Sequence, residues 1–257
     1  DTYALAKALN VCGLMNVQFA VREGEVYVLE VNPRASRTVP FVSKSIGVPL
    51  AKLASLVMVG KKLKDLNYTE EVKPEHFCCK EAVFPFVRFP GIDVVLSPEM
   101  KSTGEAIGYD DKLTRALYKA LKASGMNVMN YGTVLATIAD KDKEEALPLI
   151  RRFYNMGFNI QATAGTAEFL KQNGIRTHAV GKLSDGSKEI TDAIRQGYVT
   201  YVINTRDMNS SGVLSDGYEI RRCAVENNVT MFTSLDTVKV LLDVLEETTL
   251  GISTIDA

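Results

Sequence analysis

Apolar and polar stretches alternate regularly in the second half of the chain. Between and after the apolar runs, positions at helical spacing predict helices at Lys143–Met156, Thr166–Asn173, Lys188–Gln196, Tyr218–Asn227 and Asp236–Glu246. The runs themselves, rich in β-branched residues, predict strands at Thr133–Ile138, Phe158–Ala162, Thr177–Val180, Val199–Ile203 and Val229–Phe232. Strands that alternate with helices predict a parallel sheet covered on both faces, an α/β fold.

The first half of the chain has a different pattern, which predicts a β-hairpin. Met15–Val21 and Glu25–Val31 are two apolar, β-branched runs joined by a polar turn. Gly24 can adopt the positive φ that a three-residue hairpin loop needs, and a turn centred there places Gln18 opposite Glu30. Around this hairpin the pattern predicts helices at Thr2–Asn10, Leu50–Gly60 and Tyr109–Gly125, the last capped by Asp110 or Asp111, and an extended segment at His76–Gly91. We place the domain boundary just after the third helix, which gives domains 1–126 and 127–257.

Three oxygen-bearing side chains are expected to meet at one end of the hairpin. Glu30 and Asn32 share a strand face because side chains alternate with period two, and Gln18 lies opposite Glu30. Arg34 and Arg37 follow directly after the strand. Oxygen ligands beside arginines suit Mg²⁺ shared with substrate phosphates. The alternative is a solvated hairpin with ordinary surface residues.

Polar side chains also follow four of the predicted parallel strands. Lys143 begins the helix after the first strand, Thr163 and Thr166 follow the second, Lys182 follows the third, and Asn204 ends the fourth. Ligands of such sheets bind beyond the carboxyl ends of the strands, and a helix N-terminus favours anions. Together these residues predict a site for a phosphate-bearing ligand, although each alone could be a helix cap or a solvated lysine.

Composition excludes several classes of protein. A formal net charge of −1 argues against an electrostatic grip on nucleic acid, and no apolar run reaches the length of a membrane span. The four cysteines contain no C-x-x-C pair, so neither a disulfide framework nor a zinc knuckle is indicated. With no signal peptide apparent, a reducing, cytoplasmic location is expected.

The sequence of the hairpin region resembles that of a known family. Gln18 followed by Glu30-Val31-Asn32-Pro33-Arg34, within GLMNVQFA and EVNPRASRTVPFVSK, is similar to the metal-binding signature of ATP-grasp ligases, and specifically to the second ATP-grasp unit of carbamoyl-phosphate synthase large subunits. The resemblance implies the C-terminal part of an ATP-grasp fold (α+β), followed by a doubly wound, methylglyoxal-synthase-like allosteric domain. It also implies ATP and Mg²⁺ (or Mn²⁺) as cofactors, held by Gln18, Glu30 and Asn32, with Arg34 and Arg37 steadying the transferred phosphoryl group.

The same resemblance implies regulation and partners. Lys143, Thr163, Thr166 and Lys182 correspond to phosphate contacts of a nucleotide effector such as UMP or IMP, and Asn204 lies near its ribose or base. Glu81 corresponds to a carboxylate that binds an amine effector, ornithine in some members, with Thr233 as a second contact. A small, glutaminase subunit and oligomerisation through the C-terminal domain are expected as well.

Three other functional hypotheses stay open. No glycine-rich phosphate loop or adenine pocket precedes the hairpin, so we expect a fragment that is inactive alone, and an effector-binding module would describe it. A methylglyoxal-synthase-like lyase would need catalytic aspartates near the strand ends, for which Asp207 and Asp216 are the candidates. A biotin-carboxylase-like enzyme would share the Glu/Asn metal pattern but would not end in a second parallel sheet.

Overall fold

The computed structural model describes residues 1–88, 100–102, 104–205 and 216–247. Within it the chain forms two compact units, Asp1–Cys78 and Cys79–Ala257, which are described separately. This division follows packing and falls earlier than residue 126, where the sequence pattern and the resemblance place the domain boundary. The boundary at residue 126 stays a prediction about how the chain is built from family parts.

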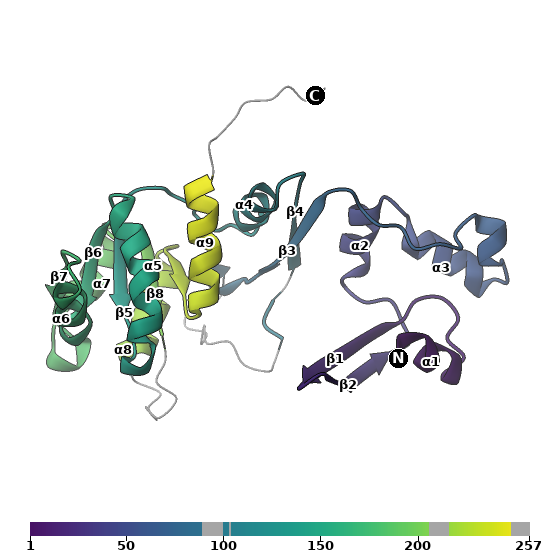
Figure 1. The fold of residues 1–257 in the computed structure, drawn as a ribbon, viewed down its shortest axis with the longest axis horizontal. Helices are drawn as coiled ribbons and strands as arrows, with labels where there is room; N and C mark the ends of the chain where they lie inside the picture. The colour runs from purple at the N-terminus through teal and green to yellow at the C-terminus, as the bar shows by residue number, and fades with distance from the viewer. Residues whose placement is uncertain (89–99, 103, 206–215, 248–257) are drawn as a thin grey trace, which may run out of the picture. The chain divides into compact units, whose positions relative to one another are not determined.

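The first unit contains the predicted hairpin and a helical layer. Its elements are α1 (Thr2–Ala8), β1 (Asn16–Arg22), β2 (Glu25–Asn32), α2 (Val39–Ile46), α3 (Leu50–Met58) and the 3-10 turn η1 (Leu63–Leu66) (Figure 1). Helix α2 has a proline in its first turn and ends at Gly47, whose φ of 67° is the left-handed conformation typical of a helix C-terminus. It was not predicted, because Val39–Pro49 is too short for a clear apolar period.

Among the described residues, no single helix has the length and apolar character to cross a bilayer. Only α2 and α3 taken together meet that criterion, by length and composition, and the pair is bent by 111°.

The second unit begins with a small two-stranded sheet. Strand β3 (Phe77–Val83) begins two residues before the division between the units and pairs with β4 (Gly104–Asp110), and η2 (Phe86–Arg88) lies between them in the sequence. Helix α4 (Leu113–Ala123) then packs on β4. The helix expected within Tyr109–Gly125 is confirmed, but its predicted N-cap at Asp110 or Asp111 is wrong, because Tyr109 and Asp110 end a strand and the N-cap residue is Lys112. Asp110 instead accepts a hydrogen bond from the backbone N–H of Lys112 (3.1 Å), just before the helix.

The five predicted parallel strands form one sheet in the order β7-β6-β5-β8-β9. The strands are β5 (Thr133–Thr137), β6 (Asn159–Thr163), β7 (His178–Val180), β8 (Tyr201–Asn204) and β9 (Thr230–Phe232). The helices are α5 (Lys143–Asn155), α6 (Ala164–Gln172), α7 (Glu189–Arg195), α8 (Asp216–Glu226) and α9 (Leu235–Glu247), with short 3-10 turns η3 (Asp140–Asp142) and η4 (Leu183–Asp185). The order reverses direction at β5, so the ligand crevice of this topology is expected beyond the carboxyl ends of β5 and β8.

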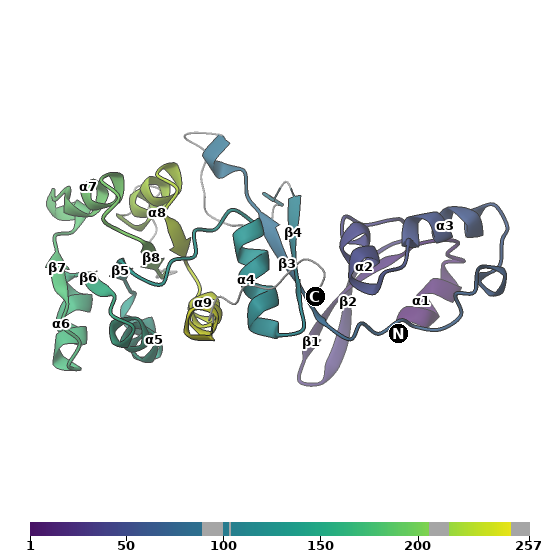
Figure 2. The same ribbon diagram turned by 90° about the horizontal axis from the view of Figure 1, so that it is seen from above.

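Alternating side chains send the strands into two separate cores. On one face, Val134 and Ala136 of β5 and Tyr201 of β8 pack with apolar residues of α4, α5, α6 and α9. On the other, Leu135 and Val202 pack with α7 and α8. Figure 2 shows the sheet edge-on between these helical layers. The α/β fold class predicted from the sequence is confirmed.

Candidate functional site

The hairpin brings Glu30 and Asn32 together as predicted. Gln18 and Glu30 are cross-strand partners, and the Asn32 amide Nδ2 donates a hydrogen bond of 2.8 Å to Glu30 Oε1. With its nitrogen committed to Glu30, the Asn32 amide keeps its oxygen for another partner. Gln18 and Glu30 are exposed and Asn32 is half-buried.

The register that aligns these residues has a different origin from the one expected. Arg22 pairs with Glu25, so the loop contains two residues, Glu23 (φ 53°) and Gly24 (φ 84°), and not three. Two positive φ values are typical of the type I′ turn, which matches the twist of a hairpin. A β-bulge between Gln18 and Phe19 then shifts the register by one residue and restores the Gln18–Glu30 pair.

The two arginines lie in the loop between β2 and α2. The N–H of Arg34 donates to the carbonyl of Asn32 (2.8 Å), which closes a tight turn around Pro33. The Arg34 guanidinium donates to the neighbouring Ala35 carbonyl (3.1 Å), and both Arg34 and Arg37 are exposed. The arginines therefore stand at the same end of the hairpin as Asn32.

This group of side chains fits a hard cation better than a transition metal. Within the described residues, no three His, Cys, Asp or Glu side chains gather as a metal site. The hairpin offers one carboxylate and two amides, so a cation there would take its remaining ligands from water or phosphate, as Mg²⁺ does.

At the carboxyl edge of the parallel sheet, Lys143 is the centre of a charged cluster. Its ammonium forms an ion pair with Asp140 (2.6 Å), donates to the Gly165 carbonyl (3.1 Å) and lies 5.9 Å from the Phe169 ring centroid. The pKa of Asp140 is lowered, first by the hydrogen bond and charge of Lys143 and further by the charge of Lys182. Lys143 and Lys182, both predicted site residues, thus both favour the charged form of Asp140, whose side chain is 93% exposed.

Two other predicted residues at this edge are already engaged inside the protein. The Thr166 hydroxyl is buried and lies 3.4 Å from both the N–H and the carbonyl of Ile138. The Asn204 amide is also buried, and its Nδ2 donates to the Thr137 hydroxyl (2.6 Å) while its Oδ1 accepts from Arg221 (2.6 Å). Thr163 occupies the N-cap position of α6 and is half-buried at the edge.

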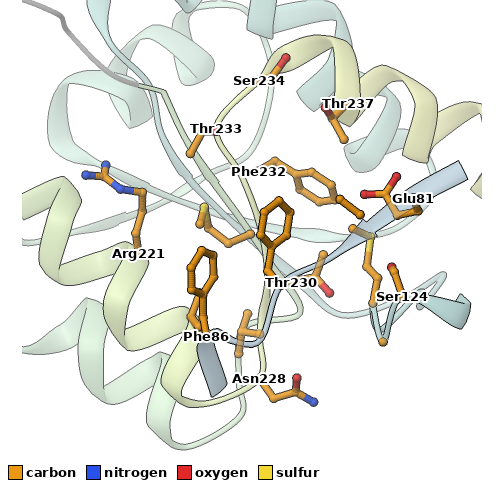
Figure 3. Close-up of a pocket in the computed structure, with 17 residues that line it drawn as sticks. Glu81, Phe86, Ser124, Arg221, Asn228, Thr230, Phe232, Thr233, Ser234 and Thr237 are labelled. Carbon is orange, nitrogen blue, oxygen red and sulfur yellow. The ribbon is translucent and has the colours of Figure 1, made fainter. Parts of the chain in front are cut away.

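A separate pocket of about 560 Å³ lies along β9, which is one of the two edge strands of the sheet (Figure 3). Its walls come from β3, the end of α4, α8 and the whole of β9, and both Glu81 and Thr233 line it. Phe84 and Phe86, stacked with centroids 5.3 Å apart, supply an aromatic wall. The Glu81 carboxyl group lines a mainly apolar cavity, and this burial raises its pKa.

Sequence reasoning missed Asp140, Thr137 and Arg221. Asp140 precedes Lys143 by three residues at a strand end, a spacing that could have indicated an ion pair. Arg221 stands among Ile220, Cys223 and Ala224 on the buried side of α8, where a lone arginine signals a buried partner. That partner lies 17 residues away in the sequence and could not be named without the fold.

The residues singled out for the lyase hypothesis give it no support. Asp216 accepts hydrogen bonds of 3.1 Å from both the N–H and the hydroxyl of Ser184. Asp207 lies outside the described residues.

Comparison with known proteins finds family matches in both halves of the chain. Residues 1–66 match the family model of the carbamoyl-phosphate synthase L chain, ATP-binding domain, and residues 145–233 match that of the MGS-like domain. The chain thus joins a segment similar to the ATP-binding domain of that L chain to a segment similar to an MGS-like domain. The two matches, in this order, are those of the C-terminal part of a carbamoyl-phosphate synthase large chain, the family that the sequence resembles.

Solved structures that match part of the chain include a methylglyoxal synthase from Elizabethkingia anophelis NUHP1, at 19% identity and a TM-score of 0.39 over 45% of this chain and 79% of that one. Another is ForH, at 17% identity and a TM-score of 0.35 over 46% of this chain and 80% of that one.

Proposed function

We propose that this chain contributes to the ATP-dependent phosphorylation of carbamate to carbamoyl phosphate, for pyrimidine and arginine biosynthesis, and carries the nucleotide control of that reaction. The observation that carries the proposal is the pairing of Gln18 with Glu30, with Asn32 hydrogen-bonded to Glu30 at 2.8 Å and two arginines directly behind. Phosphoryl transfer depends mainly on positioning and on neutralising charge, and this group of residues supplies both.

Gln18, Glu30 and Asn32 would hold Mg²⁺ or Mn²⁺ through a carboxylate and amide oxygens. When bound, the cation neutralises charge on the phosphate oxygens of ATP. Arg34 and Arg37 would bind oxygens of the transferred group, since a guanidinium matches phosphate oxygens in a bidentate manner. By itself the chain would hydrolyse no ATP, because the resemblance assigns the adenine and phosphate-loop residues to another part of the enzyme.

The carboxyl edge of the parallel sheet would bind a nucleotide effector such as UMP or IMP. Lys143 and Lys182 both act on Asp140, so a phosphate in its place would meet two cations and the N-terminus of α6. Thr163 is the hydroxyl expected to contact the phosphate. Thr166 and Asn204 would act through the backbone and side chains they hold, because their own polar atoms are engaged.

The pocket along β9 would bind an amine effector such as ornithine. Glu81 offers a carboxylate to an ammonium group, and Thr233 is a second polar residue that lines the same pocket. In the cytoplasmic enzyme we expect a small, glutaminase subunit as partner and oligomerisation through the C-terminal domain.

The test is a calorimetric titration of the full chain with UMP, IMP and AMP, together with an ATPase assay. We expect one nucleotide to bind, and the Lys143→Met variant to bind it about 10- to 100-fold more weakly, since a charge-assisted hydrogen bond contributes about 1.5–3 kcal/mol. Lys171→Met, on the exposed last turn of α6, is the control. Carbamate-dependent ADP release would contradict the expected inactivity of the chain by itself, and methylglyoxal formed from dihydroxyacetone phosphate would contradict the proposal.

A further inference from the structure

The carboxyl edge of the parallel sheet carries an anion of its own. Asp140, the first residue of η3, forms an ion pair of 2.6 Å with Lys143, which stands three residues further along at the start of α5. Residues three apart on a helical turn are neighbours, so this pair forms within the loop between β5 and α5 itself. The Asp140 side chain is 93% exposed, whereas that of Lys143 is 17% exposed. An exposed carboxylate thus occupies a largely buried ammonium.

Two more contacts hold the Lys143 ammonium where the proposed phosphate would bind. It donates to the Gly165 carbonyl (3.1 Å) and lies 5.9 Å from the Phe169 ring centroid, so it rests against the first two turns of α6. Lys182 adds a second positive charge, which helps to lower the pKa of Asp140. Asp140 therefore neutralises the same positive charges that an effector phosphate would neutralise.

The backbone that carries Asp140 is held in place by hydrogen bonds just before it. The N–H of Ala139 donates to the Thr205 hydroxyl (2.8 Å), and the N–H of Ile138 lies 3.4 Å from the buried Thr166 hydroxyl. These contacts tie the end of β5 to the segment after β8 and to the first turn of α6. Release of the ammonium therefore needs only a change of rotamer in a side chain that already lies in solvent, and no rearrangement of the backbone.

We propose that Asp140 is an intrinsic competitor of the effector phosphate: its carboxylate pairs with Lys143 until a phosphate displaces it, and this exchange sets the effector concentration to which the site responds. A phosphate monoester carries more charge and more acceptor oxygens than a carboxylate, so it forms the stronger interaction with the lysines and the N-terminus of α6. The apparent affinity of a ligand falls in proportion to the fraction of molecules in which its site is available, so the ion pair lowers effector affinity. This inference rests on the proposed nucleotide site and names a residue that limits its affinity.

The experiment compares nucleotide binding to the full chain as the wild type, Asp140→Asn, Lys143→Met and the double variant. Calorimetry with UMP and with IMP gives each dissociation constant. Asparagine keeps the size of the side chain and removes its charge, so Asp140→Asn should bind the effector about three- to tenfold more tightly than the wild type does. In the Lys143→Met background the same change should alter affinity less than about twofold, because the ammonium for which Asp140 competes is gone.

Asp185→Asn is the matched control. Asp185 is an exposed aspartate of η4, close to Lys182 in the sequence, so its replacement removes the same charge near this edge and leaves the Asp140–Lys143 pair in place. It should change effector affinity less than about twofold, since salt screens exposed charges that are not in contact. Unchanged or weaker binding by Asp140→Asn, an equal gain in Asp185→Asn, or an equal gain in the Lys143→Met background would overturn the role of Asp140 alone. Absence of nucleotide binding to both the wild type and Asp140→Asn would overturn the proposed function, and this inference with it.

Discussion

Replacing Glu81 by Gln should have opposite effects on ligand binding and on stability. Burial raises the pKa of Glu81, so the folded protein holds this proton more tightly than the unfolded chain does. The stabilising contribution of the neutral acid is present below the unfolded pKa and is lost as the pH rises through the higher folded pKa. At neutral pH the wild type bears the cost of a partly buried charge, which the neutral glutamine removes.

The effect on binding has the other sign, because an ammonium ligand needs the charged form. A hydrogen bond to a charged group contributes about 1.5–3 kcal/mol, so Glu81→Gln should weaken ornithine binding at neutral pH about 10- to 100-fold. Wild-type affinity should also fall as the pH drops through the raised pKa of Glu81. Arg221 is the other ionisable side chain that lines the pocket, and it stays charged throughout this range.

Calorimetry of ornithine binding and urea unfolding, each followed from mildly acidic to mildly alkaline pH, measure the two effects. Glu105→Gln is the control. Glu105, on β4, forms an ion pair with Lys80 on β3 (3.1 Å) and does not line the pocket. The reasoning fails if Glu81→Gln binds ornithine as tightly as the wild type, or if it is less stable than the wild type at neutral pH.

Three further changes test the fold and the hairpin. Tyr201→Phe removes a hydroxyl that donates to the Met129 carbonyl (2.7 Å) and accepts from the Met129 N–H (2.6 Å). This change should lower the free energy of unfolding by about 2 kcal/mol. An unchanged urea midpoint would contradict this expectation. Gly108→Ala would drive a Cβ into the backbone carbonyl oxygen of Ala116 in α4 and should destabilise by about 3 kcal/mol or more, whereas Gly104→Ala, with its nearest neighbour at 3.9 Å, should fold normally. Glu30→Gln should weaken Mn²⁺ binding, followed by electron paramagnetic resonance, at least about tenfold, and Glu25→Gln at the far end of the strand should not.

The parallel sheet could be predicted from the sequence almost to the residue. Strands such as β5 are buried on both faces, so they read as continuous apolar runs with clear ends, and the helices between them have distinct apolar stripes. Strand β4 could not be predicted in this way. It contains two glycines and pairs with β3 across a long stretch of chain, so its stability comes from partners and not from its own composition.

The charged edge of the sheet was predictable as a location but not as a set of contacts. The topology alone places the carboxyl ends of β5, β6, β7 and β8 along one edge, so residues after those strands were expected to gather there. Which of them remain available to a ligand depends on partners from distant segments. Asn204 is held by Arg221 from α8, and the sequence does not identify Asn204 as the partner of that arginine.

The hairpin illustrates how a correct register can arise from an incorrect loop. A three-residue loop and a two-residue loop followed by a bulge both place Gln18 opposite Glu30, and the chain uses the second. Register has period two, so the two-residue loop without its bulge would have set Gln18 opposite Leu29 and turned Glu30 away from it. The extra residue in β2 therefore determines whether the oxygen ligands converge, which makes the bulge part of the proposed metal site and not a defect beside it.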